Sequence, residues 1–352
     1  MGLSAPPQAE GLRIATWNVG LERRGPGLLL RDITRDADPQ VQAVLQIIAR
    51  LDADILLLTG VDFDAGGAAL TALQDRLAAR DAAYPYHLAL RPNTGVQTGL
   101  DLDGDGRIGG ARDAQGYGRF AGAGGMALLS RLPIDPAGVQ DFSTFLWRDL
   151  PGALLPPGMT KADRASQRLS STGHWLVSVT LPSGQPISLL AFHATPPVFD
   201  GPEDRNGRRN HDEAAFWRLF LQGALPFAPP KGPVVLLGDA NLDPVNGHGR
   251  PAALRALLAG PPLQDPRPRG SAGRRDDGQR GDAALDTALY DPPLGGLRLD
   301  YVLPDARLSV IGAGVLWPGP DDALARTLQT ASRHYPVWVD LDLPGQPAPT
   351  AP

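Results

Sequence analysis

Six polar residues stand at or beside the ends of apolar, strand-like segments, and their types suit the handling of a phosphate or a metal ion. They are Asn18, His193, Asp239, Asn241, Asp300 and His334. Carboxylate and amide oxygens bind hard cations such as Mg²⁺, and imidazole groups exchange protons near neutral pH. A single Asn or Asp in such a place is more often a turn former, so the evidence lies in the ordered set.

The segments that must position these residues are mostly short and apolar. Strand-like runs cover residues 12–18, 54–58, 126–130, 175–180, 187–192, 234–238, 298–303 and 337–343. Helical spacing of apolar residues is found over 37–51, 68–83 and 212–225. Strands dominate without a regular β-α-β alternation, which favours sheets packed face to face with helices outside.

The composition and net charge of the chain exclude several classes of protein and of active site. The 352 residues are 42% hydrophobic and 20% charged, an ordinary globular balance. The net charge of −5 argues against binding nucleic acid by bulk electrostatics, so any phosphate recognition must be local. No apolar run reaches about 18 residues, so we expect no membrane span. The absence of cysteine excludes thiol catalysis, disulfides and Cys-based zinc sites.

The expected localisation is the periplasm or the cell exterior. Complete absence of cysteine fits an exported bacterial protein, in which stray thiols are a hazard, and chance absence is an equal alternative. Residues 1–11 lack the charged start and apolar stretch of a signal peptide, so none is visible in this chain.

The polar residues lie in motifs that resemble those of the endonuclease/exonuclease/phosphatase superfamily, which includes pancreatic DNase, apurinic endonucleases, bacterial sphingomyelinases and inositol polyphosphate 5-phosphatases. The matching segments are Thr16-Trp-Asn18, Gly125-Met-Ala-Leu-Leu-Ser-Arg131, His193, Gly238-Asp-Ala-Asn241, Arg298-Leu-Asp-Tyr301 and Ser332-Arg-His334. The resemblance implies a four-layer α/β/β/α sandwich, with two packed, mostly antiparallel sheets flanked by helices. We expect one domain over residues 11–343, a flexible loop over 264–286 and flexible tails over 1–10 and 344–352.

The resemblance also implies roles for the six residues and a divalent metal, Mg²⁺ or Mn²⁺. Asp300 would orient His334, because a carboxylate bonded to one imidazole nitrogen fixes the tautomer and raises the basicity of the other. Asp239 would activate or position the attacking water, and the two asparagines would hold phosphoryl oxygens or metal. His193 would donate to a non-bridging oxygen or steady the leaving group.

Two departures from the family pattern weaken the expected metal site. Relatives read Leu-Gln-Glu where this chain reads Leu58-Thr-Gly60, and that Glu holds the metal. Arg333 replaces the Asp of the closing Ser-Asp-His. One carboxylate is lost and another becomes a guanidinium, and each unit charge near the metal is worth about 4 kcal/mol at an effective dielectric of ~20. Three consequences are open: Asp62 or Asp64 supplies a carboxylate to the vacated position, Arg333 contacts the phosphate itself, or the site is catalytically dead.

A second cation site is expected in an inserted loop over residues 101–113. Asp101, Asp103 and Asp105, followed by Gly, match the opening of a calcium-binding loop. The twelfth position is Arg112 rather than Glu, and Asp113 comes next. The alternative is an Asp/Gly-rich surface turn. Weak sites of this kind work at extracellular calcium levels, which also favours an exported protein.

Three further residues are candidates for substrate contact. Arg205 and Arg209, in the segment after His193, are suited to clamping phosphates, with a solvated loop of mixed charge as an equal alternative. Tyr117 is a candidate to line the substrate cleft.

The expected function is metal-assisted hydrolysis of a phosphodiester in nucleic acid, lipid or a small molecule. The alternatives are a phosphomonoesterase and a non-catalytic protein that binds phosphate or calcium.

Overall fold

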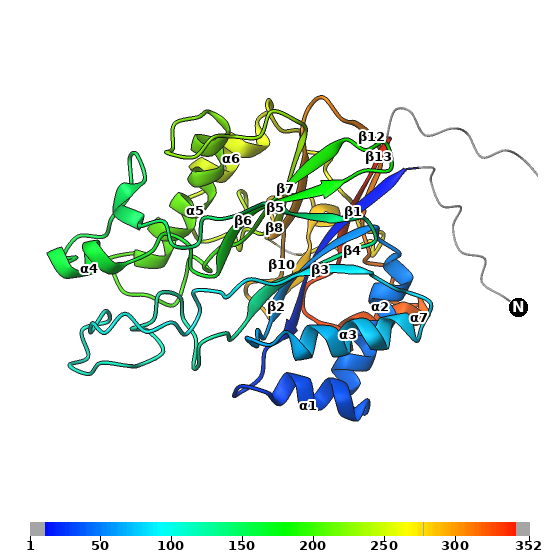
Figure 1. Ribbon diagram of the computed structural model, residues 1–352, viewed down its shortest axis with the longest axis horizontal. Helices are drawn as coiled ribbons and strands as arrows, with labels where there is room; N and C mark the ends of the chain where they lie inside the picture. The colour runs from blue at the N-terminus through cyan, green and yellow to red at the C-terminus, as the bar shows by residue number, and fades with distance from the viewer. Residues whose placement is uncertain (1–10, 277, 343–352) are drawn as a thin grey trace, which may run out of the picture.

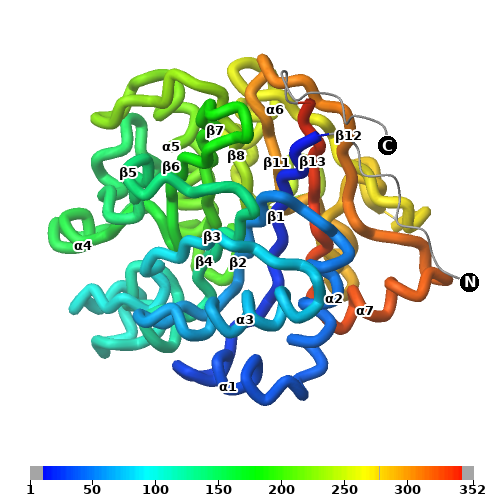
Figure 2. Tube along the Cα trace, turned by 45° about the vertical axis from the view of Figure 1, so that its right-hand side comes forward, coloured from blue at the N-terminus to red at the C-terminus, as the bar shows by residue number. Residues whose placement is uncertain are grey.

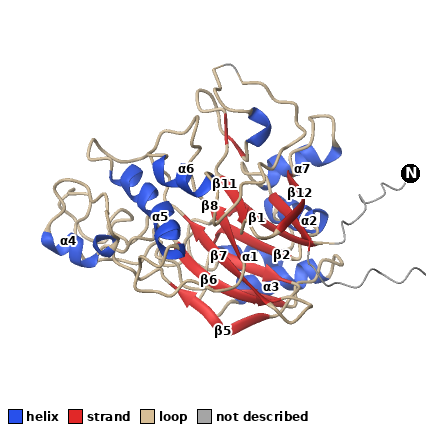
Figure 3. Ribbon diagram, turned by 90° about the horizontal axis from the view of Figure 1, so that it is seen from above, coloured by secondary structure: helices blue, strands red, loops and turns tan. Residues whose placement is uncertain are grey.

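Two β-sheets lie face to face, and helices cover the outer side of each (Figure 1, Figure 3). The computed structural model describes residues 11–276 and 278–342. The predicted four-layer sandwich of helices, sheet, sheet and helices is therefore confirmed. The expected tails, 1–10 and 344–352, lie outside the described residues.

The first sheet has six strands in the order β12-β13-β1-β2-β4-β3. Their bounds are β1 Leu12–Leu21, β2 Ile55–Val61, β3 Tyr86–Leu88, β4 Gly125–Ser130, β12 Ser309–Val315 and β13 Val337–Asp342. Strand β1 pairs in parallel with β2 and antiparallel with β13, so strands from the two ends of the chain lie side by side in the middle of the sheet (Figure 2). This pairing brings the segment before β13 to the end of β1.

The second sheet has five strands in the order β11-β8-β7-β6-β5. Their bounds are β5 Ile134–Asp141, β6 Gly173–Thr180, β7 Pro186–His193, β8 Val234–Asp239 and β11 Asp300–Pro304. The side chains alternate between the two faces, as in any strand. On β7, Leu189 and Ala191 join the core between the sheets, whereas Leu190 and Phe192 join the core under the helices.

The helices form one group on each sheet. The group on the first sheet comprises α1 Leu28–Arg35, α2 Pro39–Leu51, α3 Ala68–Ala78 and α7 Ala323–Ala331, and the group beside the second comprises α4 Lys161–Ser166, α5 Arg205–Leu221 and α6 Ala252–Leu258. Helix α5 contributes Phe216, Trp217 and Phe220 to the second core. None of the described helices is long and apolar enough to cross a membrane.

Several elements depart from the sequence-based expectations. Helix α5 begins at Arg205 rather than near residue 212, because the polar residues of its first turns bond to neighbouring loops instead of solvent. Strand β5 was not expected: it is a largely exposed edge strand that contains Pro136, so it lacks the apolar pattern of a buried strand. The 264–286 stretch is held on one side by an ion pair, 2.6 Å long, between Asp265 and Arg298.

Candidate functional site

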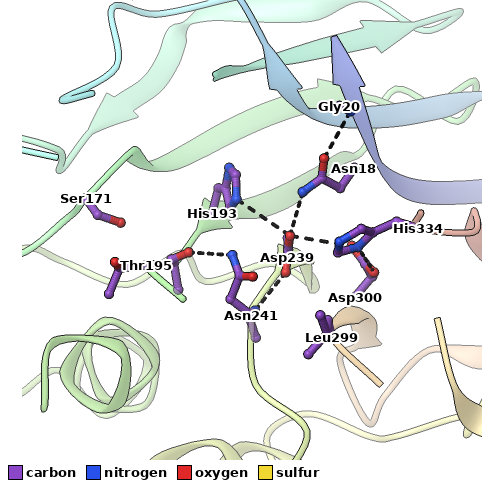
Figure 4. Close-up of polar contacts among 12 residues, drawn as sticks. Asn18, Gly20, Ser171, His193, Thr195, Asp239, Asn241, Leu299, Asp300 and His334 are labelled. Carbon is purple, nitrogen blue, oxygen red and sulfur yellow. Dashed lines mark hydrogen bonds and ion pairs between the residues drawn. The ribbon is translucent and has the colours of Figure 1, made fainter. Parts of the chain in front are cut away.

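Asp239, the last residue of β8, is the centre of the candidate site (Figure 4). Its register partners are His193 at the end of β7 and Asp300 at the start of β11. Asn18 reaches over from the other sheet, and its Nδ2 donates to Asp239 Oδ2 at 2.8 Å. His193 Nε2 lies 3.6 Å and His334 Nδ1 lies 4.0 Å from the same oxygen. Sheet pairing thus brings the sequence-predicted residues around one carboxylate.

The Gly-Asp-Ala-Asn turn after β8 has two backbone requirements. Gly238 has φ +145°, and a Cβ there would lie 1.9 Å from the carbonyl oxygen of Phe192, so no other residue fits without a shift. Asn241 has φ +50°, its N–H donates to Asp239 Oδ1 at 2.7 Å, and its Nδ2 donates to the carbonyl of Ala194 at 2.8 Å. The turn therefore orients the Asp239 carboxylate and ties β8 to the end of β7.

Polar side chains of helix α5 form hydrogen bonds with the backbone that follows β7 and β8. Asn210 Nδ2 donates to the carbonyls of Thr195 and Ala240, at 2.7 and 2.8 Å. The buried carboxylate of Glu213 accepts from the N–H groups of Thr195 and Ser171, at 2.7 and 2.6 Å. The amide nitrogen of Asn210 and the carboxylate of Glu213 thus hold the segments that follow His193 and Asp239, while Asn210 Oδ1 stays without a partner among the described residues. Neither residue was identified from the sequence, in which they look like ordinary polar helix residues.

Asp300 and His334 form a buried pair beside Asp239. Asp300 Oδ2 lies 2.8 Å from His334 Nδ1 and also accepts from the hydroxyl of Thr287 at 2.8 Å. Asp300 Oδ1 is buried without a hydrogen-bond partner among the described residues. The backbone of His334 is held as well, since Trp17 Nε1 donates to its carbonyl at 2.8 Å. The pair has the geometry in which a carboxylate fixes the tautomer of an imidazole.

The two histidines have opposite pKa shifts. Burial by itself lowers the pKa of His334, but the Asp300 carboxylate, its hydrogen bond and Asp239 outweigh burial and raise the pKa to about 9. Burial lowers the pKa of His193, and Asp239 opposes this only in part. His334 is therefore a cation at neutral pH and His193 is neutral, so the site holds one positive and one uncharged imidazole.

The oxygen-rich side of the site fits a divalent cation. Asp239, Asp300 and His334 each offer a ligand atom within 4.8 Å of the others. Asp300 and His334 bond to each other, which leaves the carboxylate of Asp239 and the side-chain oxygen of Asn18 as candidate oxygen donors; the Asn18 oxygen also accepts from the N–H of Gly20 at 3.1 Å. Carboxylate and amide oxygens are the ligands that Mg²⁺ and Mn²⁺ prefer.

A family model identifies the family of this chain. The model described as the Endonuclease/Exonuclease/phosphatase family matches residues 15–334. The chain belongs to the endonuclease/exonuclease/phosphatase family. Members of this family are hydrolases that act on phosphoester bonds, and they typically depend on a divalent metal.

Solved structures with the same fold include other members of the endonuclease/exonuclease/phosphatase family. A family protein from Leptotrichia buccalis has 16% identity and a TM-score of 0.54, over 94% of this chain and 100% of that one. One from Beutenbergia cavernae has 20% identity and a TM-score of 0.52, over 94% of this chain and 71% of that one. Sphingomyelinase C from Streptomyces griseocarneus has 18% identity and a TM-score of 0.50, over 95% and 100%. At these identities the likeness establishes the fold alone. No curated protein matches the chain.

Gly60 occupies the position at which the family motif carries its metal-binding glutamate, and neither expected substitute lies there. Asp62 is buried, and its two oxygens accept from the N–H groups of Arg23 and Gly124, at 2.8 and 3.0 Å. Both oxygens of Asp64 accept from N–H groups in the first turn of α3, at 2.8 Å. Both carboxylates are therefore committed to backbone N–H groups, which speaks against the metal role expected for them.

Glu22, which was not identified from the sequence, lies at the mouth of the site. It directly follows β1 in a segment with no recognisable motif. Part of its side chain is exposed, but the carboxylate is crowded by protein, and this desolvation raises its pKa. His193 and His334 oppose the increase electrostatically, and Asp239 adds to it. The carboxylate thus lies within the electrostatic reach of the residues that carry the chemistry.

Tyr290 is a second residue that the sequence analysis missed. It follows β9 Ala288–Leu289, which pairs with β10 Gly296–Leu297, and its hydroxyl lies 3.2 Å from His334 Nε2. Arg333 is exposed, and its guanidinium carbon lies 5.9 Å from the centre of the Tyr290 ring. Its proposed contact with phosphate stays a prediction, and the side chain is free enough to make it.

The structure places Arg205 and Arg209 away from the site. Arg205 donates to the carbonyl of Leu102 at 2.7 Å and to Gln167 Oε1 at 2.9 Å, which anchors the 101–113 loop. Arg209 is buried, and its guanidinium donates to backbone carbonyls, including that of Leu169 at 2.8 Å. Most of their donors bond to protein acceptors, although Arg205 Nε is buried without a partner in the part of the chain that the structure describes, so neither guanidinium is arranged as a phosphate clamp in this conformation. Tyr117 is exposed on the loop before β4, and its role stays a prediction.

The loop over residues 101–113 has the shape of a closed acidic turn. The carboxylates of Asp101, Asp103 and Asp105 converge within 4.8 Å of one another. Asp101 also accepts from backbone N–H groups inside the loop, such as that of Gly104 at 2.8 Å. Asp113 bonds to the backbone of residues 102 and 110, at 2.8 and 2.9 Å, and so closes the loop. A calcium site and a surface turn both fit this geometry, and the calcium site stays a prediction.

Proposed function

We propose that this chain is a metal-assisted phosphodiesterase of the nuclease type, in which water attacks phosphorus in line. The observation that supports this proposal is the single carboxylate of Asp239, which is contacted by Asn18 at 2.8 Å and lies near a neutral His193 and a cationic His334. Such a set offers a group to position water, donors for phosphoryl oxygens and a positive charge for the transition state.

Each residue of the site has a separate proposed role in the hydrolysis. Asp239 accepts a proton from the attacking water or orients it. His334, held by Asp300, faces the developing negative charge with its imidazolium, and His193 donates to a phosphoryl oxygen or to the leaving oxygen. Asn241 holds the turn that aims Asp239. A bound divalent cation would neutralise phosphoryl charge and lower the pKa of water.

The substrate class is the less specific part of the proposal. We favour a diester in nucleic acid, lipid or a small molecule, with a monoester as the alternative. A net charge of −5 requires that phosphate binding be local to this site. Export of the protein is a further part of the proposal, supported by the acidic 101–113 loop and the cysteine-free composition.

The experiment is a hydrolysis assay on bis-p-nitrophenyl phosphate, p-nitrophenyl phosphate and plasmid DNA, each with Mg²⁺, Mn²⁺ and Ca²⁺. We expect the diester to be hydrolysed faster than the monoester and His334→Ala to lose at least about 10²-fold in turnover. His87→Ala, at an exposed position on edge strand β3, is the matched control. Equal background rates in the wild type and His334→Ala on every substrate would instead support a non-catalytic phosphate-binding protein.

A further inference from the structure

The carboxylate of Glu22 occupies space that two glycines leave open. A Cβ built on Gly60 would lie 2.6 Å from Asn18 Oδ1 and 3.4 Å from Glu22 Oε1. A Cβ built on Gly124 would lie 2.7 Å from Glu22 Oε1. Both glycines have positive φ, +69° and +56°, which a side chain would strain further. A side chain at either position would therefore collide with the carboxylate of Glu22 or with the amide of Asn18.

No other role accounts for this carboxylate. Among the described residues, no hydrogen-bond donor is within reach of its oxygens, and no arginine or lysine pairs with it. The groups that act on it electrostatically are His193, His334, Asp239 and Asp62. The two histidines attract it and the carboxylates of Asp62 and Asp239 repel it, and a bound cation would relieve the repulsion among the carboxylates.

The segment that carries Glu22 is held firmly. Asp62 accepts from the N–H of Arg23 at 2.8 Å and from that of Gly124 at 3.0 Å, so it joins the backbone on both sides of the Glu22 side chain. The Arg23 guanidinium in turn donates to Asp32 at 2.8 Å. Asp62 is thus a positioning residue for Glu22. This role explains why the Asp62 carboxylate lies close to the site without entering it.

We propose that Glu22 supplies the carboxylate ligand of the divalent metal, together with the side-chain oxygens of Asn18 and Asp239, in place of a ligand from position 60. Strands β1 and β2 run in parallel, and their register shifts opposite Gly60, so a residue just beyond β1 can lie over that glycine. In this proposal the carboxylate ligand comes from the residue after β1 instead of from position 60 in β2. All three ligand atoms are still oxygens, which suits Mg²⁺ or Mn²⁺. This inference rests on the proposed function, because it names the metal ligand of the same site.

The test is direct binding of Mn²⁺ to the full chain, measured from the loss of the free Mn²⁺ signal in electron paramagnetic resonance. We expect Glu22→Gln to weaken binding by at least about tenfold, since even outer residues of metal sites cost that much. Glu203→Gln is the matched control, because Glu203 lies in the loop before α5 and, among the described residues, its carboxylate accepts only from the N–H of Gly201. Glu22→Asp, which keeps the charge but shortens the reach, should bind with intermediate affinity.

The outcomes separate this inference from the proposed function. If Glu22→Gln binds Mn²⁺ as tightly as the wild type, Glu22 is not a ligand, whatever the hydrolysis rates are. If the wild type binds Mn²⁺ through Glu22 but hydrolyses no phosphoester, the ligand assignment stands and the proposed function fails. Thermal unfolding with a chelator present should give Glu22→Gln a melting temperature equal to or above that of the wild type, because the side chain makes no stabilising hydrogen bond and its charge is desolvated.

Discussion

Asp300 begins β11 and His334 lies in the segment before β13, and their side chains meet inside the protein with 2.8 Å between Oδ2 and Nδ1. The hydroxyl of Thr287 donates to the same oxygen of the carboxylate, and the hydroxyl of Tyr290 lies 3.2 Å from the far nitrogen of the ring. The imidazole is therefore bonded at both nitrogens, and its charge depends on one buried carboxylate.

Asp300→Asn is expected to lower the pKa of His334 from about 9 toward its ordinary value, because the negative partner is removed while the burial remains. Turnover should fall by about 10²–10⁴-fold at neutral pH. NMR titration of the His334 ring and steady-state kinetics measure the two effects. Asp321→Asn, at an exposed position before α7, is the control. An unchanged pKa of His334 would contradict the pairing.

The pair also makes stability depend on alkaline pH. The pKa of His334 is higher in the folded state than in the unfolded chain, so the folded state binds the proton more tightly. The stabilisation is complete below about pH 6.5 and is lost as pH rises through about 9, up to about 3 kcal/mol. Urea unfolding at pH 6, 8 and 10 with a chelator should show this loss in the wild type. A His334→Gln protein with the same loss would refute the assignment.

Tyr290→Phe is expected to slow hydrolysis by about tenfold and to leave the fold intact. The hydroxyl is the partner of His334 Nε2, and a tenfold change corresponds to about 1.4 kcal/mol, which is within the range of one net hydrogen bond. The expected change is in kcat, because the contact is to a residue proposed to act on the transition state. Tyr86→Phe, on exposed edge strand β3, should have no effect. Equal rates for both variants would show that the hydroxyl is dispensable.

Arg209→Met is expected to destabilise the protein by about 3–5 kcal/mol, because it removes one partner of a buried charge arrangement. The guanidinium donates to carbonyls such as that of Ser170 at 3.0 Å, and it is the charge that opposes the raised pKa of Glu213. Arg208→Met, one residue earlier and more exposed, should cost far less. Urea unfolding gives both values. A change in KM with no change in stability would instead favour a phosphate clamp.

Calcium binding to the 101–113 loop is tested by calorimetric titration. If the loop is a site, Ca²⁺ should bind with millimolar to submillimolar affinity, as in extracellular modules. Asp103→Ala should remove the heat, since its carboxylate belongs to the convergent acidic group. Asp75→Ala, exposed on α3, controls for the loss of a surface charge. No heat in the wild type would leave the loop as a surface turn.

The sequence alone was sufficient to predict the central strands of both sheets. It was also sufficient to predict the candidate site residues at the ends of these strands. Buried central strands such as β2 and β8 are continuous apolar runs, and the turn after β8 requires Gly238 for a backbone reason that is local to the chain. Asn18, His193, Asp239, Asp300 and His334 could be grouped because their motifs occur in order. Strand pairing brings His193 and Asp300 beside Asp239, whereas the contacts of Asn18 and His334 come across from the other sheet.

The tertiary structure alone decided which other side chains join that group. Arg209 reads as a loop cation in the sequence, but its environment is set by the carbonyls of residues far from it in the chain. The relation of Glu22 to Gly60 and Gly124 is invisible in the sequence, because it depends on space left by absent side chains on other strands. Burial, charge pairing and open space are properties of the packed molecule, so they emerge only once distant segments are brought into contact.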